Sequence, residues 1–145
     1  MSRKKGEPFA SKHAGKGVNV DEKISAAIRG KAVNGEISCR NAIEIARVLN
    51  TGTDVVGINI DLAELHINRC QLGIFGYKPE KRILKAADTV TPELEEAIRK
   101  NLVNNRLSCI AAWGIAENLQ IPKMDVASAC EKLGIKIKPC QLGAF

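Results

Sequence analysis

Residues 115–135, IAENLQIPKMDVASACEKLGI, decide how this chain is expected to fold. Apolar residues recur at helical spacing on both sides of the short segment Gln120-Ile121-Pro122. The first stripe consists of Ala112, Ile115, Ala116 and Leu119, and the second of Val126, Cys130 and Leu133. The pattern predicts a helix that ends near Leu119, a tight turn, and a second helix over about 123–133.

The residues around this stretch complete a small unit. Thr91-Pro92-Glu93 is typical of a helix start, with Thr91 as the N-cap, and Ser108 is placed to cap the next helix. After the third helix, residues 135–138 alternate apolar and basic side chains, which is the period of a half-buried strand. We therefore expect three helices followed by a short strand.

The whole unit occurs twice. Offset by 70 residues, segment 21–75 aligns with segment 91–145 without a gap, with 18 identities in 55 positions. The agreement is closest at the ends, where Cys-Gln-Leu-Gly-x-Phe occurs at 70–75 and at 140–145. A duplicated domain is expected, its copies packed with pseudo-two-fold symmetry. Residues 65–68 repeat the strand pattern, and we expect the strands of the two copies to pair with each other.

Positive charge lies mainly outside the two copies. Of the net charge of +6, residues 1–20 carry +4 and residues 76–90 carry +2. We therefore divide the chain into a basic flexible N-terminal tail (1–20), repeat 1 (21–75), a basic linker (76–90) and repeat 2 (91–145). A basic arm suits a polyanion such as nucleic acid, although a tail that only aids solubility has the same pattern.

The 21-residue stretch resembles the helix-turn-helix of bacterial and archaeal transcriptional regulators. Ala116, Leu119 and Ile121 match the small and apolar positions of that motif, and Val126 and Leu133 match its buried positions on the recognition helix. Repeat 1 keeps this skeleton over residues 45–65 but has Thr51-Gly52 in the turn. The expected fold is mainly α, with two tandem three-helix helix-turn-helix-like units. The resemblance implies DNA binding, with the third helix in the major groove.

The third helices are poor in basic residues. In repeat 1, Ile58 and Asn59 are the only candidates for reading bases, while Asp54, Asp61 and Glu64 would repel phosphates. Repeat 2 is the better candidate. The predicted nucleic-acid contacts are Arg3, Lys4 and Lys5 in the tail, Lys123, Ser128 and Lys132 on the third helix, and Lys136 and Lys138 on the strand.

Four cysteines occupy equivalent positions in the copies: Cys39, Cys70, Cys109 and Cys140. Their spacing is not that of a zinc site, but convergence of all four would allow a metal site or a redox-sensitive disulfide. Burial as small apolar side chains is the simpler interpretation. Gly73 and Gly143 indicate a closing turn in each copy. Trp113 is expected to be a packing residue.

Several classes of function are not supported by the sequence. It has no glycine-rich phosphate loop, nucleophile elbow or histidine–carboxylate constellation, so we expect a binding protein without a cofactor rather than an enzyme. No apolar stretch is long enough to span a membrane, and the basic start lacks a secretory core, so a cytoplasmic protein is expected. Three hypotheses remain: a DNA-binding protein, such as a transcriptional regulator; a module for a protein partner or homodimer; and a cysteine-based switch.

Overall fold

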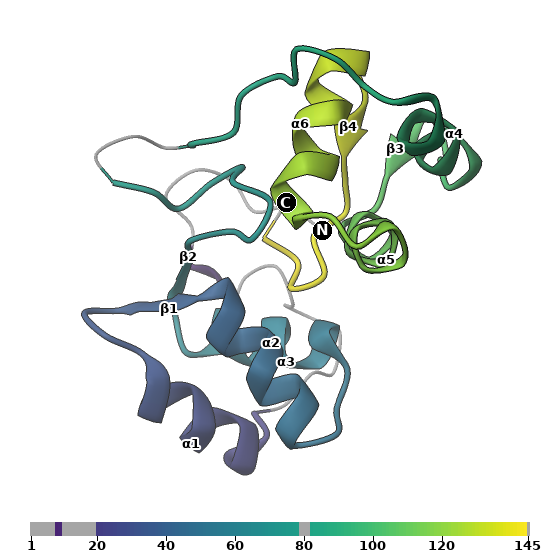
Figure 1. The fold of residues 1–145 in the computed structure, drawn as a ribbon. Helices are drawn as coiled ribbons and strands as arrows, with labels where there is room; N and C mark the ends of the chain where they lie inside the picture. The colour runs from purple at the N-terminus through teal and green to yellow at the C-terminus, as the bar shows by residue number, and fades with distance from the viewer. Residues whose placement is uncertain (1–7, 10–19, 79–81, 145) are drawn as a thin grey trace. The chain divides into compact units, whose positions relative to one another are not determined.

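The computed structural model describes residues 8–9, 20–78 and 82–144. Within these ranges the chain is mainly α-helical, as expected (Figure 1). The helices are α1 (Glu22–Lys31), α2 (Cys39–Val48), α3 (Thr53–Leu62), α4 (Pro92–Lys100), α5 (Cys109–Leu119) and α6 (Lys123–Leu133). The short strands are β1 (Glu36–Ser38), β2 (His66–Asn68), β3 (Arg106–Leu107) and β4 (Lys136–Ile137).

Side-chain caps fix where four of the helices begin: α1, with Asp21 as its cap, α2, α4 and α5. Thr91 accepts a hydrogen bond from the backbone N–H of Leu94, and Ser108 accepts one from Ala111, which confirms both predicted caps. Ser38 caps α2 in the same way, through Asn41. Each cap satisfies a backbone N–H that the first turn of a helix leaves unpaired, and is worth about 1 kcal/mol.

The turn between α5 and α6 depends on a left-handed residue. Gln120 has a φ of 55°, which ends α5, and Pro122 then precedes the first turn of α6. Gly134 ends α6 with a φ of 71°, a conformation that costs glycine little because it has no Cβ. Both ends of α6 therefore lie where the sequence places them, at Lys123 and Leu133.

The strand pairing differs from the prediction. β2 pairs in parallel with β1, and β4 pairs in parallel with β3, so the strands after the third helices do not pair with each other. The partner in each case is a segment of two or three residues just before the second helix. Such a segment is too short to show the alternation that identifies a strand in a sequence.

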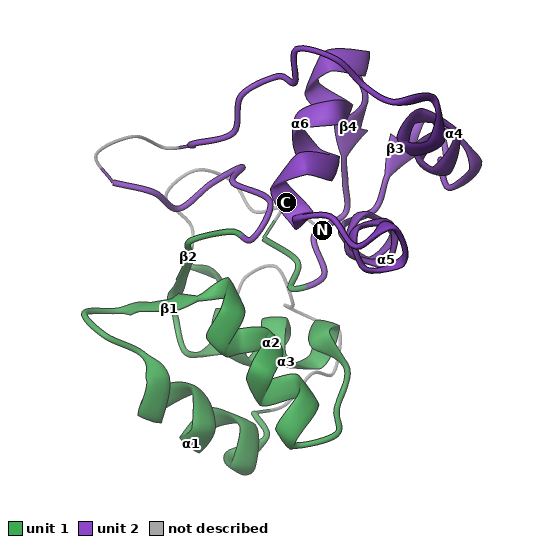
Figure 2. Cartoon of the chain, in the orientation of Figure 1, with its two compact units in different colours: residues 1–70, 142–145 green, residues 71–141 purple. Residues whose placement is uncertain are grey.

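The chain forms two compact units, which Figure 2 colours separately. Unit 1 comprises residues 1–70 and 142–145, and unit 2 comprises residues 71–141. Each unit has its own apolar core. In unit 1 the core includes Ile24, Ile28, Ile37, Val56, Ile60 and Leu142; in unit 2 it includes Leu72, Leu94, Ile98, Leu107, Val126 and Cys130. Val126 is fully buried, as predicted, and so is Val56 at the equivalent position of repeat 1.

The two Leu-Gly pairs each complete a core. Leu142 is buried in unit 1, where its backbone lies directly against Gly57 of α3. Leu72 is buried in unit 2, where the adjacent Gly73 lies against the side chain of Met124 on α6. Gly73 and Gly143 have φ values of +74° and +76°, which confirms the predicted turns.

No helix in the described part of the chain is both long enough and apolar enough to cross a membrane.

Candidate nucleic-acid interface

Three basic side chains gather on the small sheet of unit 2. Arg106 of β3 and Lys136 of β4 are directly opposite each other in the parallel register, and both are exposed. Lys138 follows two residues after Lys136, is also exposed, and donates its backbone N–H to the carbonyl oxygen of Leu107. Because side chains alternate between the faces of a strand, all three lie on the exposed face. We call Arg106, Lys136 and Lys138 the basic edge.

Within the described residues of unit 2, the basic edge has no ion-pair partner. No carboxylate among the described residues forms an ion pair with any of its three side chains. Neighbouring strands are about 4.8 Å apart, so the edge holds like charges close together in the absence of a ligand. An anion placed over the edge would relieve this repulsion. Lys136 and Lys138 were predicted as contacts, whereas Arg106 was missed because its strand was not recognised.

The same positions in unit 1 carry no basic edge. Arg106, Lys136 and Lys138 correspond to Glu36, His66 and Asn68. The amide of Asn68 donates to the carboxylate of Glu36 at 2.7 Å. The ring of Phe9 contacts His66 edge to face, with 4.7 Å between ring centroids, and the backbone N–H of Phe9 donates to Glu64 at 2.6 Å. The corresponding surface of unit 1 is thus partly covered by its own chain.

Of the two candidate base readers of repeat 1, Asn59 is placed differently from expectation. Asn59 is buried, and its side chain accepts a hydrogen bond from Asp21 N–H at 2.9 Å and donates one to the Val55 carbonyl oxygen at 3.0 Å. Asp61 is also buried, so it does not lie on an outer face toward phosphates, as the sequence suggested. Asn59 therefore holds the start of α1 to α3 and is not a base reader.

The predicted contact residues on α6 differ in their exposure and in their neighbours. The Lys123 ammonium lies 4.5 Å from the centre of the Trp113 ring, which fixes it against α5. Lys132 is exposed near the end of the helix, whereas Ser128 is half-buried. Trp113 is partly exposed, but its indole Nε1 is buried without a hydrogen-bond partner among the described residues.

The linker crosses the outer face of α6. We call residues 82–88 the strap. Arg82 forms an ion pair with Glu131 at 2.7 Å, and Ala87 donates its backbone N–H to the carbonyl oxygen of Ser128 at 3.0 Å. Leu84 is buried, and its backbone N–H donates to the carbonyl oxygen of Gly73. The strap is thus attached to unit 2 at several points along its length.

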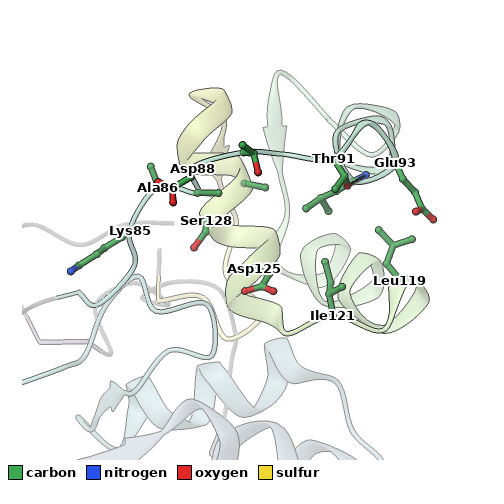
Figure 3. A pocket seen from close by; sticks show the side chains of 13 residues that line it. Lys85, Ala86, Asp88, Thr91, Glu93, Leu119, Ile121, Asp125 and Ser128 are labelled. Carbon is green, nitrogen blue, oxygen red and sulfur yellow. Dashed lines mark hydrogen bonds between the residues drawn. The ribbon is translucent and has the colours of Figure 1, made fainter.

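A cavity of about 610 Å³ separates part of the linker from the helices (Figure 3). Its lining combines residues of the linker with the turn between α5 and α6 and with Asp125, Ser128 and Ala129 of α6. Both polar and apolar side chains line it. The segment after Leu84 is therefore held to α6 by few contacts and is not packed tightly against it.

The cysteines form part of the cores. All five are buried. Cys109 lies beside the segment that carries Cys140, because its backbone N–H donates to the Pro139 carbonyl oxygen and its sulfur accepts a hydrogen bond from Gln141 at 3.6 Å. Among the described residues, no group of three or more His, Cys, Asp or Glu side chains could hold a metal ion. The predicted tail contacts Arg3, Lys4 and Lys5 lie outside the described residues.

In comparisons with known proteins, the chain matches no family model, no curated protein and no solved structure.

Proposed function

We propose that this chain is a DNA-binding protein, without enzymatic activity, whose repeat 2 contacts the phosphate backbone of duplex DNA. In this proposal the two repeats are helix-turn-helix-like units related by pseudo-two-fold symmetry. α5, its turn and α6 form the motif of repeat 2, and β4 acts as a wing. The role that the resemblance implies is the regulation of transcription.

The observation that carries the proposal is the basic edge. Arg106 faces Lys136 in the β3–β4 register, Lys138 lies on the same exposed face, and no described carboxylate neutralises them. Phosphate contacts from such side chains supply most of the affinity of a protein for DNA irrespective of sequence. Repeat 1 has Glu36, His66 and Asn68 at these positions and neither Lys nor Arg, which favours repeat 2 for the contact.

The basic tail adds to this surface in the proposal. Residues 1–20 carry a net charge of +4, and Arg3, Lys4 and Lys5 are close together in the sequence. A basic arm attached to a helical DNA-binding unit increases affinity by contacting phosphates or a groove. Removal of residues 1–7 would take away Arg3, Lys4 and Lys5 and leave Phe9 in place.

The test replaces the three residues of the basic edge with those at the equivalent positions of repeat 1. Binding of a fluorescently labelled 20-base-pair duplex is measured by anisotropy between 20 and 200 mM salt for the full chain and for the triple variant R106E/K136H/K138N. The full chain is expected to bind at low salt. The three side chains should contribute about 2.7 to the slope of log K against log salt, at about 0.9 per phosphate. The triple variant should lose this contribution.

A control separates the site from the net charge. The double variant K23E/K31E changes two exposed lysines of α1 and alters the total charge by the same amount as the triple variant. It should bind nearly as well as the unchanged chain. Equal losses in both variants would show that only the overall charge matters. Absence of binding at 20 mM salt would refute the proposal and favour a module for a protein partner.

A further inference from the structure

The strap and Gly73 partly cover the outer face of α6. Gly73 contacts Met124, and the strap contacts Ser128 and Glu131; these three residues are spaced i, i+4 and i+7 and therefore lie along one helix face. The opposite face carries Val126 and Cys130, both buried in the core. The covered face is thus the one that would point into the major groove if α6 were a recognition helix.

The side chains of α6 outside this face are also unsuited to reading bases. Asp125 is exposed and acidic and would approach phosphates unfavourably. Lys123 is positioned over Trp113. Specific contacts in the major groove come mainly from Arg, Lys, Asn and Gln side chains directed at base edges. α6 contains neither Arg, Asn nor Gln, and Lys132 is its one remaining basic residue.

The third helix of repeat 1 does not supply base-reading side chains either. The one amide side chain on α3, that of Asn59, is buried and uses both its oxygen and its nitrogen in hydrogen bonds within unit 1. α3 contains no Arg or Lys. Among the described residues, neither third helix therefore presents the set of donors that direct base recognition needs.

We infer that the chain binds duplex DNA through the sugar–phosphate backbone without selecting a base sequence, because neither third helix presents a set of base-reading donors and the strap and Gly73 partly cover the outer face of α6. This inference rests on the proposed function and specifies its ligand as DNA of any sequence. The basic edge supplies the contacts, since phosphates are spaced regularly in every duplex.

The first experiment measures sequence preference for the full chain. Three rounds of selection are carried out from a duplex pool with a random 20-base-pair centre, and affinities are then measured for two unrelated duplexes of equal base composition. No motif should be enriched, and the two affinities should agree within about twofold. Proteins that read sequence typically prefer their sites by about a thousandfold or more. An enriched motif that binds more than tenfold tighter would overturn the inference.

The second experiment maps the groove directly. Dimethyl sulfate methylates guanine N7 in the major groove, whereas ethylation of phosphates reports backbone contacts. On one defined duplex, bound protein should leave every guanine N7 reactive, and ethylated phosphates should interfere with binding. Protection of guanine N7 would overturn the inference even without an enriched motif.

Variants separate this inference from the proposed function. K136Q should weaken binding to both unrelated duplexes by the same factor, and S128A should leave both affinities within twofold of the unchanged chain. A loss of affinity in S128A for one duplex only would contradict backbone binding and leave DNA binding itself intact. Absence of binding to either duplex at 20 mM salt would instead refute the proposed function and the inference together.

Discussion

The backbone of Leu142 occupies the space that a side chain on Gly57 would need. A Cβ on Gly57 would lie 2.0 Å from the carbonyl oxygen of Leu142 and 2.6 Å from its carbonyl carbon. Both residues belong to unit 1, and both are buried. The absence of a side chain in the middle of α3 therefore allows the chain end to complete the core of unit 1.

Substitution of Gly57 by alanine is expected to destabilise unit 1. Alanine favours a helix by about 1 kcal/mol over glycine, but the added methyl group would displace a backbone segment, and overpacking costs typically about 1–3 kcal/mol. We expect a net loss of up to roughly 2 kcal/mol from these two terms. Urea unfolding followed by circular dichroism would measure the change.

Gly114 provides the matched control for this variant. It lies inside α5, and nothing is within 4 Å of the position that its Cβ would take. G114A should therefore stabilise the chain by about 0.5–1 kcal/mol through helix propensity alone. A G57A variant that gains stability as G114A does would show that Leu142 is not packed against α3 as described.

The thiol of Cys130 should make stability depend on alkaline pH. Burial raises the pKa of this thiol from its usual value of 9.0 to about 11, with a smaller contribution from the charge of Glu131. The folded chain thus keeps the proton to a higher pH than the unfolded chain does. Its contribution to stability is complete below pH 9 and is lost as the pH rises toward 11.

A variant isolates this contribution from other groups that titrate in the same range. Unfolding free energies of the full chain and of C130A are compared between pH 8 and 11. The difference between them should shrink as the pH rises, because only the full chain loses the contribution of the thiol. Iodoacetamide at pH 8 should also modify Cys130 far more slowly in the folded chain than in urea. A constant difference and rapid modification would contradict a buried, protonated thiol.

The contact between Lys123 and Trp113 should be visible in fluorescence. Trp113 is the one tryptophan of the chain, and the Lys123 ammonium lies 4.5 Å from its ring centre. K123Q should shift the emission maximum and reduce stability by about 0.5–1 kcal/mol, the usual range for an exposed cation–π pair. K132Q removes a lysine of the same helix for which no contact with Trp113 is described. It should change neither the emission maximum nor the stability. Identical spectra for the full chain and K123Q would disprove the contact.

Much of the helical structure could be predicted from the sequence because it depends on local interactions. Thr91 and Ser108 are followed by apolar residues at helical spacing, so both caps and the start of α6 could be located from a few neighbouring residues. Val126 was predicted as core because helical periodicity places it on the apolar face. The mainly α class follows from the same signals.

The strand partners and the covered face of α6 could not be predicted because they depend on residues distant in sequence. Arg106 joins Lys136 only through a parallel pairing across 30 residues, and β3 is too short to be recognised alone. Asn59 looked like an outward-facing reader, yet its partner Asp21 lies 38 residues away. The sequence of the linker shows its charge, but its path over Ser128 depends on one backbone hydrogen bond and on the burial of Leu84.

Leu84 is expected to control whether the strap stays on α6. Its side chain is buried, whereas that of the adjacent Ile83 is 41% exposed. L84A removes apolar contacts at the point where the strap is attached, and truncation of a buried leucine costs about 2–5 kcal/mol. Because few contacts hold the segment beyond it, the strap should open locally while the core of unit 2 remains folded.

Hydrogen exchange followed by mass spectrometry would test this directly. In L84A, the backbone amides of residues 83, 84 and 87, which donate to Gly73 and Ser128, should exchange faster than in the full chain. The amides inside α6 should keep their protection, because their acceptors belong to the helix. I83A changes an exposed neighbour on the same strap and should leave all of these rates close to those of the full chain. Equal loss of protection across the strap and α6 would instead mean that Leu84 supports the whole unit, and that the strap does not open separately from the helix that it covers.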